Sequence, residues 1–446
     1  MKKFSIGGVH PPENKLGRKI PIQVMELPKR AYIPLGQHIG APATAIVAKG
    51  DMVVTGQLIA EATGFMSANI HSSVTGKVFS VGVEKSAQGL SVPTIVIDRA
   101  EEEIWAEEID TTAEVVRVCD LEPIAILDRI KAAGIVGMGG ATFPTHVKLS
   151  IPPQKRAESL IINGAECEPY LTSDHRSMLE RGEEFMIGVS LLMRVIGVAN
   201  AYVGIESNKP DAIEKLTELA NDFKGVEVVP LKVQYPQGGE KQLIEAITGR
   251  EVPPPPGLPI DVGAVVVNVS TAIAVYEAVQ KRKPLIERVV TVSGKSSDQP
   301  LNMVVRFGTP ISALLERIGG LPDDTGKVIN GGPMMGRAMV NLDSPVTKGC
   351  SGITIVAVGE AERAEESPCL KCGKCVSACP MSLEPYLLSK LMKRGAMEQL
   401  EERNVTDCIE CGSCQFTCPA KLPLLDYIRL GKQRVMGIIR ARSMNK

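Results

Sequence analysis

The sequence is poor in aromatic residues and carries almost no net charge. Phe, Trp and Tyr together make up 4% of its 446 residues, and there is a single Trp. Lys and Arg number 50 against 51 Asp and Glu, which gives a formal net charge of -1. Because a chain without an overall positive field has little to hold a phosphate backbone, nucleic acid is not an expected partner.

Long apolar runs are also missing. The two most apolar stretches, Met186–Ile205 and Gly263–Val279, are interrupted by Arg194 in the first and by Asn268 in the second. A membrane-spanning helix needs about 20 consecutive apolar residues, so we expect none. The opening residues reach His10 and two prolines before any apolar core forms, and we therefore expect no signal peptide.

Cysteine is the reactive residue that the sequence does contain in number. Eight of the 11 cysteines fall in two runs of identical spacing, and no export signal accompanies them. This pattern is typical of metal binding in a reducing compartment rather than of disulfides. The two runs, each followed by proline, consist of Cys369, Cys372, Cys375 and Cys379, and of Cys408, Cys411, Cys414 and Cys418.

The spacing of these runs predicts two [4Fe–4S] clusters. Three thiolates at i, i+3 and i+6 can contact three irons of one cubane, and in two-cluster ferredoxins the fourth thiolate reaches the neighbouring cluster. Structural zinc also uses Cys-x-x-Cys pairs, but four ligands per ion leave the third pair and the repeated Cys-Pro ending unexplained. We expect one cluster on Cys369, Cys372, Cys375 and Cys418, and the other on Cys408, Cys411, Cys414 and Cys379.

The patterning of the first 282 residues predicts a β unit followed by an α/β unit. Residues 1–105 contain short β-branched runs between turn signals, and two of their segments, Val47–Asp51 and His71–Val78, resemble the lipoyl/biotinyl barrel-sandwich hybrid fold. Thr63–Ser67, between them, has no lysine to carry a cofactor, so a docking or scaffold role is expected. Helical and strand segments alternate over 112–282, which indicates a Rossmann-like α/β layer on a mainly parallel sheet.

The rest of the chain divides into three parts. Residues 286–360 contain strands around one helical segment, Pro310–Ile318, and suggest a β-grasp unit. Residues 365–430 hold the cysteines on mostly helical sequence with a break at Gly395, and predict an α-helical ferredoxin domain. Residues 431–446 are basic and contain no acid, so we expect a soluble tail, or alternatively a contact with an acidic partner or an anionic membrane face.

A glycine-rich loop offers a place for a phosphate or a flavin ring. It begins at Gly137, continues through Gly139, Gly140 and Phe143, and ends at Lys148. Glycines let backbone N–H groups approach a ligand without interference from side chains. The loop lacks the preceding strand of the Rossmann fingerprint, and an ordinary tight turn is the alternative.

This loop resembles the flavin loop of the NADH-oxidising flavoprotein subunit of respiratory complex I. Three later stretches resemble that family in the same order: Asn163–Pro169, Tyr235–Glu240 and Val267–Thr271. The resemblance implies that Phe143, Glu168 and Glu240 meet the nucleotide NAD(H). It implies an FMN site formed by Gly137, Gly139, Gly140, Lys148, Asn163, Tyr235, Gly238, Asn268 and Thr271, and Glu166 is counted with these cofactor-binding residues.

Over residues 4–430 the chain is similar to the RnfC family, whose members belong to the Rnf electron-transport complexes. The similarity rests on Gly7–Glu13, Pro34–Pro42, Ile70–Val74, Gly331–Gly336 and the paired cysteine runs. It implies the domain order barrel-sandwich hybrid, complex-I-like flavin domain, SLBB-type β-grasp domain and helical ferredoxin domain. It also implies an oxidoreductase subunit that passes electrons between NAD(H), FMN and two [4Fe–4S] clusters.

The same resemblance implies a setting for the protein. The subunit would lie peripherally on the cytoplasmic face of the cell membrane, in a ferredoxin:NAD oxidoreductase coupled to Na⁺ or H⁺ movement. Its partners would be other Rnf-type subunits, including integral membrane subunits and a second iron–sulfur subunit. Because hydride transfer between nicotinamide and flavin needs no acid–base side chain, no catalytic residue is expected.

Two other functions are compatible with these motifs. Flavoproteins with the same modules are similar to cobalamin reductases, although those do not open with the barrel-sandwich segment. The chain could also be a cluster-bearing electron conduit without its own flavin. Three departures from the complex I pattern favour the conduit: Ala165 replaces Asp, Gly239 replaces Glu and Val267 replaces Asn.

Overall fold

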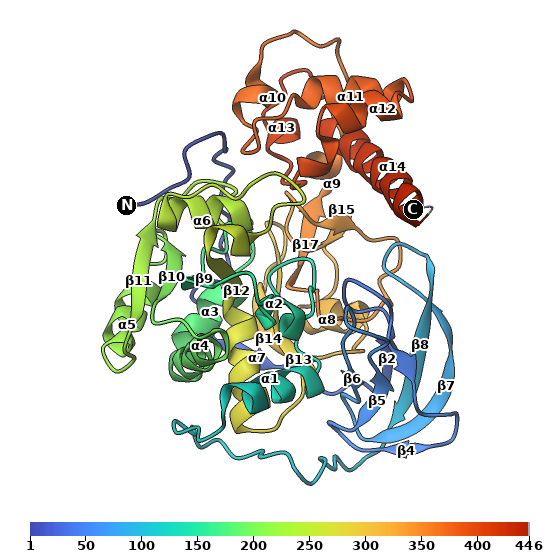
Figure 1. The fold of residues 1–446 in the computed structure, drawn as a ribbon. Coiled ribbons are helices and arrows are strands. Elements are labelled where there is room, and N and C mark those ends of the chain that lie inside the picture. The colour runs from blue at the N-terminus through green and yellow to red at the C-terminus, as the bar shows by residue number, and fades with distance from the viewer. Residues whose placement is uncertain (445–446) are drawn as a thin grey trace.

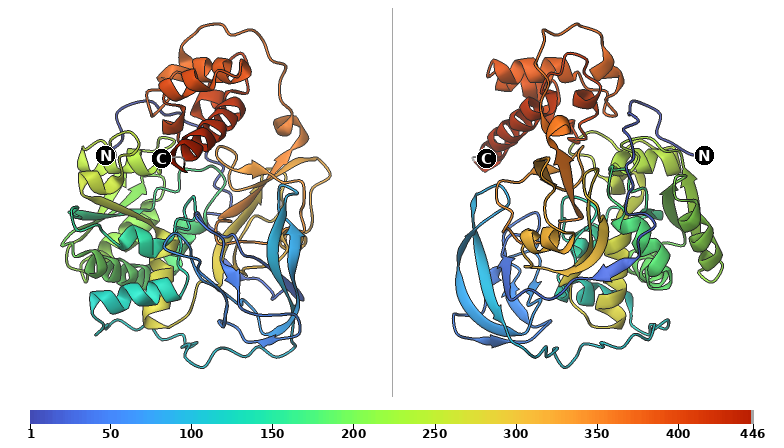
Figure 2. Two further views of the ribbon diagram at one scale, coloured as in Figure 1. Left: turned by 45° about the vertical axis from the view of Figure 1, so that its right-hand side comes forward. Right: turned by 180° about the vertical axis from the view of Figure 1, so that it is seen from behind.

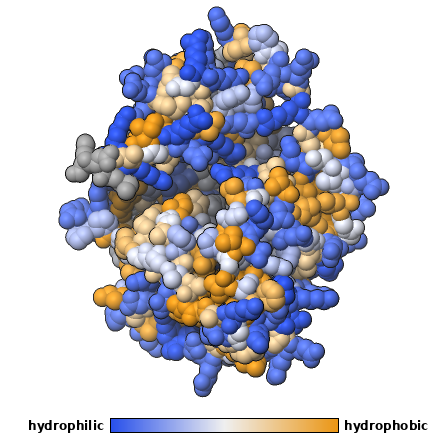
Figure 3. Space-filling view, turned by 90° about the vertical axis from the view of Figure 1, so that its right-hand side faces the viewer, coloured by the Kyte–Doolittle hydropathy of each residue, from blue (hydrophilic) through white to orange (hydrophobic). Residues whose placement is uncertain are grey.

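A computed structural model describes residues 1–444. An α/β unit and a β unit lie side by side, with strands between them and a helical unit above (Figure 1). The face shown in Figure 3 mixes hydrophilic and hydrophobic side chains. Within the described residues, no helix has the length and apolar character needed to cross a bilayer.

The first β unit consists of two small antiparallel sheets that enclose a core of branched aliphatic side chains. Ile33, Ile59, Ile70 and Ile95 are at most 1% exposed in this core. The all-β prediction for this region is confirmed. One sheet has the order β2 (Arg30–Pro34), β8 (Ser91–Arg99), β7 (Gly76–Lys85), β4 (Met52–Val53), and the other β3 (Thr44–Ala45), β5 (Leu58–Glu61), β6 (Ile70–His71).

The α/β unit is built on a four-stranded sheet in which every pair is parallel. Its strands are β9 (Ser159–Asn163), β10 (Ala201–Glu206), β11 (Val226–Leu231) and β12 (Ala264–Asn268), in the order β11-β10-β9-β12. Its helices are α1 (Pro123–Ala132), α2 (Thr145–Leu149), α3 (Ser173–Glu180), α4 (Gly182–Ile196), α5 (Pro210–Ala220), α6 (Glu240–Thr248) and α7 (Val269–Gln280), with the 3₁₀ turn η1 (Pro259–Val262). The predicted strand–helix alternation is confirmed.

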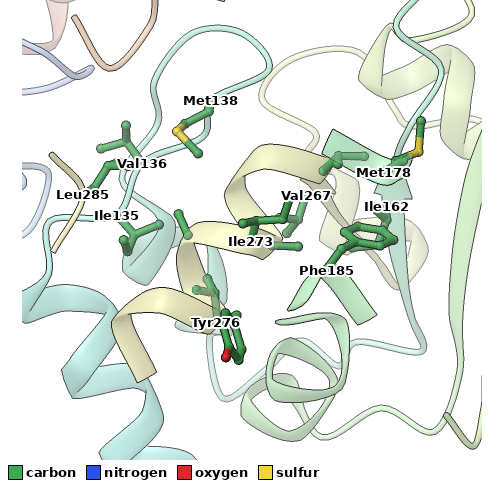
Figure 4. Close-up of a cluster of buried hydrophobic side chains, with 14 of the residues drawn as sticks. Ile135, Val136, Met138, Ile162, Met178, Phe185, Val267, Ile273, Tyr276 and Leu285 are labelled. Carbon is green, nitrogen blue, oxygen red and sulfur yellow. The ribbon is translucent and has the colours of Figure 1, made fainter. Parts of the chain in front are cut away.

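Helices α4 and α7 of this unit pack closely against each other. Gly188 of α4 lies so near α7 that an added Cβ would be 2.0 Å from the Ala272 carbonyl oxygen, so only glycine fits there. Around this contact Ile162, Phe185, Val267 and Tyr276 form part of one buried core (Figure 4). The sheet is thereby held rigidly, and the carboxyl ends of its strands are fixed relative to the loops that follow them.

A six-stranded mixed sheet lies between the two units. Its order is β1 (Ile22–Val24), β14 (Leu301–Arg306), β13 (Glu287–Gly294), β17 (Gly352–Ala357), β15 (Thr325–Asn330), β16 (Arg337–Ala338). Two helices accompany it, α8 (Ile311–Arg317), which confirms the predicted helix, and α9 (Val358–Ala361). The edge strand β1 pairs in parallel with β14, so residues 22–24 belong to this sheet and not to the barrel-sandwich sheets.

The helical unit holds the cysteine runs at the top of the molecule (Figure 2). It comprises α10 (Lys374–Ser377), α11 (Pro385–Lys393), α12 (Met397–Glu402), η2 (Val405–Asp407), α13 (Ser413–Phe416) and α14 (Leu424–Met444). Gly395, with a φ of 70°, separates α11 from α12 as predicted. The predicted basic tail from 431 differs: residues up to 444 continue α14, because Val435 is fully buried and Arg442 pairs with Glu401. Residues 445–446 lie outside the described residues.

Lys348 joins three of these units at one buried point. Its Nζ donates to the carbonyl oxygens of Asn69 at 2.8 Å and Gly134 at 2.7 Å, and the side chain is 1% exposed. Burial lowers the pKa of Lys348 from 10.5 to about 7. The unfolded chain therefore binds more protons than the folded chain between these values, and this residue's contribution to stability is lost as the pH falls from about 10.5 to about 7.

At pH 9 we expect a Lys348→Met chain to unfold at a lower temperature than the wild type. Two buried carbonyls lose their donor, which costs about 1–3 kcal/mol each. The difference in unfolding temperature between wild type and variant should widen from pH 7 to pH 9. Over this range the wild type gains stability as Lys348 loses its proton, by at most about 1.4 kcal/mol per pH unit, whereas the variant does not. Thermal unfolding at both pH values measures this, with the exposed Lys77→Met as control. An unchanged gap would contradict the assignment.

Candidate functional site

The glycine loop is held at its ends and open in its middle. The Gly137 N–H donates to the Phe143 carbonyl at 2.9 Å, and the Met138 N–H donates to Thr271 Oγ1 at 2.9 Å. Within residues 1–444 the N–H groups of Gly139 and Gly140 have no hydrogen-bond acceptor. Unpaired backbone N–H groups on a fixed loop fit a phosphate or the polar edge of a flavin.

The carboxyl ends of β9 and β12 lie beside this loop. Asn163 and Asn268 are register partners at these ends. Asn163 Nδ2 donates to the Gly238 carbonyl at 2.8 Å, whereas Asn268 caps α7 by accepting from the Ser270 N–H at 2.9 Å. Parallel α/β sheets bind ligands in the crevice outside the carboxyl ends of their strands. The arrangement therefore places two predicted FMN residues where a ligand is expected.

Gly139 is required by the approach of Asn268. A Cβ on Gly139 would be 2.7 Å from Asn268 Nδ2 and 2.8 Å from Asn268 Cβ. At Gly140 an added Cβ would meet no atom within 4 Å, so the protein leaves this side of the loop empty. The loop and the strand end thus form a cradle that fits FMN.

Lys148 and Glu240 form an ion pair at the same site. Lys148 Nζ lies 2.8 Å from Glu240 Oε1 and donates to the Val266 carbonyl at 3.0 Å. Their side chains are 33% and 41% exposed, so both remain accessible to a ligand. A cation beside the glycine loop and a carboxylate at the start of α6 suit the phosphate and the hydroxyl groups of a nucleotide, respectively.

Two buried charged residues that the sequence analysis missed hold the loop and Asn268 through hydrogen bonds. Asp174 accepts from Asn268 Nδ2 at 2.7 Å and from Ser270 Oγ at 2.8 Å. Burial, together with the negative charge of Glu166, raises the pKa of Asp174 to about 6. Arg288 donates to the Met138 carbonyl at 3.1 Å and to the Lys348 carbonyl at 2.5 Å. Both act through the loop and Asn268 as positioning residues.

Glu166 and Glu168 lie beside the site but are occupied by protein groups. The Glu166 carboxylate accepts from the N–H groups of Asp174 at 2.7 Å and His175 at 3.2 Å, in the first turn of α3. Glu168 Oε1 accepts from the N–H groups of Met334 and Met335, each at 2.8 Å. Burial raises the pKa of Glu168. In this structure Glu168 fastens the Gly331–Gly336 loop, and its role toward the nucleotide stays a prediction.

Lys15 is a further residue without a sequence signal. Its Nζ donates to the carbonyl oxygens of Glu166, Glu168 and Leu171, at 2.6, 2.9 and 2.7 Å. Glu166 itself has a φ of 43°, an uncommon backbone conformation that this lysine helps to hold. The segment after β9 is thus fixed by a side chain from the N-terminal region.

Tyr235 connects the α/β unit with the second cysteine run. Its hydroxyl donates to the Cys411 carbonyl at 2.8 Å, and its backbone pairs with Val9 in both directions. The Gly8 N–H in turn donates to the Ala378 carbonyl at 3.0 Å. Val9, Tyr235, Ala378 and Cys411 form one buried apolar cluster. The candidate flavin site therefore directly adjoins the cysteine-bearing unit.

Four cysteines surround one small cavity in that unit. They are the set predicted for one cluster: Cys379, Cys408, Cys411 and Cys414. The rest of the lining is mainly apolar and includes Leu388, Leu425 and Ile428. Burial raises the pKa of Cys408 to about 12 and also raises that of Cys414, so a cationic group is needed to keep these thiols ionised. We call this the inner cluster site.

The other four cysteines include the two most exposed ones of the runs. Cys418 is buried and Cys375 half-buried, whereas Cys369 and Cys372 are exposed on the irregular segment before α10. We call this set the outer cluster site. Within residues 1–444, no three Cys, His, Asp or Glu side chains are gathered into a site for a metal ion. Thiolates that ligate a cubane must instead spread around four irons, as the lining of the inner cavity does.

Three family models match the chain. The RnfC barrel sandwich hybrid domain matches residues 3–102, the Nuo51 FMN-binding domain matches 130–277, and the 4Fe-4S dicluster domain matches 361–419. The first match favours the RnfC resemblance over the cobalamin-reductase alternative, and the second favours a flavin site over a conduit without one. The matches also confirm the barrel-sandwich, flavin and ferredoxin domains.

Curated relatives agree over most of the length. The C subunit of the proton-translocating ferredoxin:NAD(+) oxidoreductase complex of Clostridium ljungdahlii is 47% identical, over 90% of this chain and 87% of that protein. The C subunit of the Na(+)-translocating ferredoxin:NAD(+) oxidoreductase complex of Acetobacterium woodii is 42% identical, over 96% of both. The chain belongs to the RnfC family.

The RnfC-family fold has a counterpart among solved structures. A crystal structure of NAD+-reducing [NiFe]-hydrogenase in the H2-reduced state aligns with a TM-score of 0.50 and 20% sequence identity. The alignment covers 70% of this chain and 60% of that one. At this identity the similarity concerns the fold alone.

Proposed function

We propose that this chain is the flavin- and cluster-bearing subunit that exchanges electrons with NAD(H) in a ferredoxin:NAD⁺ oxidoreductase complex. The observation that carries the proposal is the contact between two sites. The glycine loop and the strand ends form a cradle, and Tyr235 of the same unit donates to Cys411 at the inner cluster site. The proposed flavin site, which exchanges two electrons with a nicotinamide, thus lies next to the cluster sites, which carry single electrons.

The cofactors carry the chemistry, and the chain positions them. A bound flavin exchanges hydride with nicotinamide and single electrons with iron–sulfur clusters. The free N–H groups of Gly139 and Gly140 and the ammonium of Lys148 would hold the anionic parts of the flavin nucleotide. Asp174 orients Asn268 against the loop through the 2.7 Å hydrogen bond. Phe143 and Glu240 face the nicotinamide nucleotide, and no side chain is needed to transfer a proton in this step.

We infer an order for the two clusters from their burial. The inner site lies against Tyr235 and is lined by Cys379, Cys408, Cys411 and Cys414. The outer site has two exposed cysteines, Cys369 and Cys372. With both clusters bound, the inner site would exchange electrons with the flavin site, and the outer site would exchange them with a partner at the surface.

We further propose the finer architecture and setting. Residues 286–360 form an SLBB-type β-grasp unit, and 112–282 a Rossmann-like flavin domain; the sheet orders support this. We propose that the barrel-sandwich domain lies within residues 1–105, apart from β1 in the central sheet, and that the ferredoxin domain begins near 365 and includes α14 beyond 430. The chain is peripheral on the cytoplasmic face of the membrane, with Rnf-type integral membrane subunits and a second iron–sulfur subunit as partners. The complex couples electron transfer to Na⁺ or H⁺ movement, as the names of the relatives indicate for them.

Anaerobic reconstitution with iron, sulfide and FMN tests the proposal. After NADH is added, the flavin absorbance should bleach first and the cluster absorbance should follow. Clusters that form but do not respond to NADH, in a chain that retains no flavin, would leave only the electron-conduit function.

A further inference from the structure

The barrel-sandwich unit places a phenylalanine next to the glycine loop. Phe65 lies at the tip of the Thr63–Ser67 turn, where carrier domains of this fold hold a lysine, and its side chain is 66% exposed. Its ring meets the His146 ring edge-on, with centroids 6.3 Å apart and planes at 88°. His146 belongs to α2, at the end of the glycine-rich segment. An exposed aromatic side chain of one unit thus lies beside the end of the glycine-rich segment of another.

The turn that carries Phe65 is held rigidly by a neighbouring loop of the same unit. The Ala41 N–H donates to the Met66 carbonyl at 3.0 Å, and Ser67 Oγ donates to the Ala41 carbonyl at 2.9 Å. Gly40 has a φ of 108°, and a Cβ there would be 1.9 Å from the Met66 oxygen. Such close packing fixes the tip in place and excludes a swinging arm.

The Phe65 turn and the neighbouring segment that contains Ile39 both contact the C-terminal part of the glycine loop. The Ile39 N–H donates to the Thr142 carbonyl at 3.3 Å, and His146 Nε2 lies 3.3 Å from the Phe65 carbonyl oxygen. At the base, Asn69 Nδ2 donates to the Ala132 carbonyl at 3.2 Å, and Lys348 links Asn69 to Gly134. The barrel-sandwich unit therefore lies along the chain from the end of α1 to the start of α2.

We propose that Phe65 stacks on the adenine ring of NAD(H), so that the barrel-sandwich unit forms one wall of the nucleotide site. This rests on the proposed function. The nicotinamide must lie on the flavin ring, in the cradle between the glycine loop and the carboxyl ends of β9 and β12. The Phe65 turn instead contacts His146, and the neighbouring Ile39 contacts Thr142. Both contacts are at the far end of the loop, where we place the second flat ring of the dinucleotide. Phe143 belongs to the same end of the loop.

Stacking is the interaction that this geometry provides. A largely exposed aromatic ring on a rigid turn loses little conformational freedom when a base covers it, and base–aromatic stacking is sequence-tolerant and strong enough to matter. Phe65 is then a binding residue for the half of the nucleotide that does not react. Its effect should appear in substrate affinity and not in the rate of hydride transfer.

The test uses the full chain reconstituted with FMN, iron and sulfide. In Phe65→Ala we expect the KM for NADH to rise about tenfold, as expected for one lost stacking contact, with kcat for flavin reduction unchanged. Reduced nicotinamide mononucleotide, which lacks adenine, should be used equally well by variant and wild type. Phe65→Trp should restore the KM. The matched control is Phe79→Ala, a 44% exposed phenylalanine on β7 of the same unit.

Three results would overturn the inference. Phe65→Ala could behave like Phe79→Ala toward NADH, or it could weaken both nucleotides equally, or it could lose FMN. The last two would mean that Phe65 only supports the glycine loop. A wild-type chain whose flavin is not reduced by NADH would instead overturn the proposed function itself, and the wild-type measurement shows this before any variant is compared.

Discussion

In a Cys414→Ala chain we expect NADH to reduce the flavin and the electrons to go no further. Cys414 is 8% exposed in the lining of the inner cluster site, so no water or other side chain replaces its thiolate readily. Loss of one of four thiolates removes the inner cluster. The outer cluster keeps its own ligands, but it no longer has an intermediate carrier between itself and the flavin.

Iron content and spectroscopy separate these effects. Iron should fall from about eight to about four atoms per chain, because each cubane holds four. Flavin bleaching by NADH should keep its wild-type rate, while the remaining cluster stays oxidised. Cys350→Ser, a buried thiol outside both runs, is the control and should change neither quantity. Reduction of the outer cluster at the wild-type rate would show that electrons bypass the inner site.

A Gly139→Ala chain is expected to lose its flavin. The new Cβ would lie 2.7 Å from Asn268 Nδ2, closer than real Cβ contacts allow, so Asn268 or the loop must move. Either movement breaks the alignment of the loop with the strand end, and the hydrogen bond from Asn268 to Asp174 is strained with it. We expect FMN affinity to fall by about a hundredfold or more, the cost of an overpacked, rigid contact of about 3 kcal/mol.

Flavin released on denaturation, per chain, measures the loss. The control is Gly82→Ala on β7, where an added Cβ meets no atom within 4 Å. The iron content of Gly139→Ala should remain that of the wild type, because the cysteine runs lie in another unit. Full retention of FMN by this variant would mean that the cofactor is not held by the loop.

The secondary structure follows closely from local sequence, and so does the grouping of four cysteines around the inner cavity. The period-2 and period-3.6 patterns of 1–105 and 112–282 give the right element types, because each element buries one face. The cysteine spacing is itself a geometric constraint, and the inner cavity is lined by the four residues that this spacing assigned, Cys379 from one run and three from the other.

What the sequence does not reveal is which distant groups meet. Arg288 lies in a β-branched run that reads as ordinary strand, yet its guanidinium holds the Met138 carbonyl from 150 residues away. Lys15 and Asp174 likewise have no motif, because their partners are backbone or amide groups supplied by the tertiary fold. Glu168 matches a family stretch, but its contact with the Gly331–Gly336 loop depends on how two units dock. The prediction of a tail from 431 rests on charge alone, whereas burial of Val435 is set by α11 and α12.

The pairing of β1 with β14 has a consequence for cutting this protein into pieces. Three residues near the start of the chain complete a sheet whose other strands begin at residue 287. During synthesis β1 can pair only after β14, about 280 residues later in the chain, has been made. The contact has a very high sequence separation. A fragment that begins near residue 287 would lack β1 and would leave the backbone N–H and C=O groups of β14 unpaired. Unpaired strand edges promote aggregation. The central sheet therefore cannot be separated from the N-terminal segment without loss of its edge strand β1.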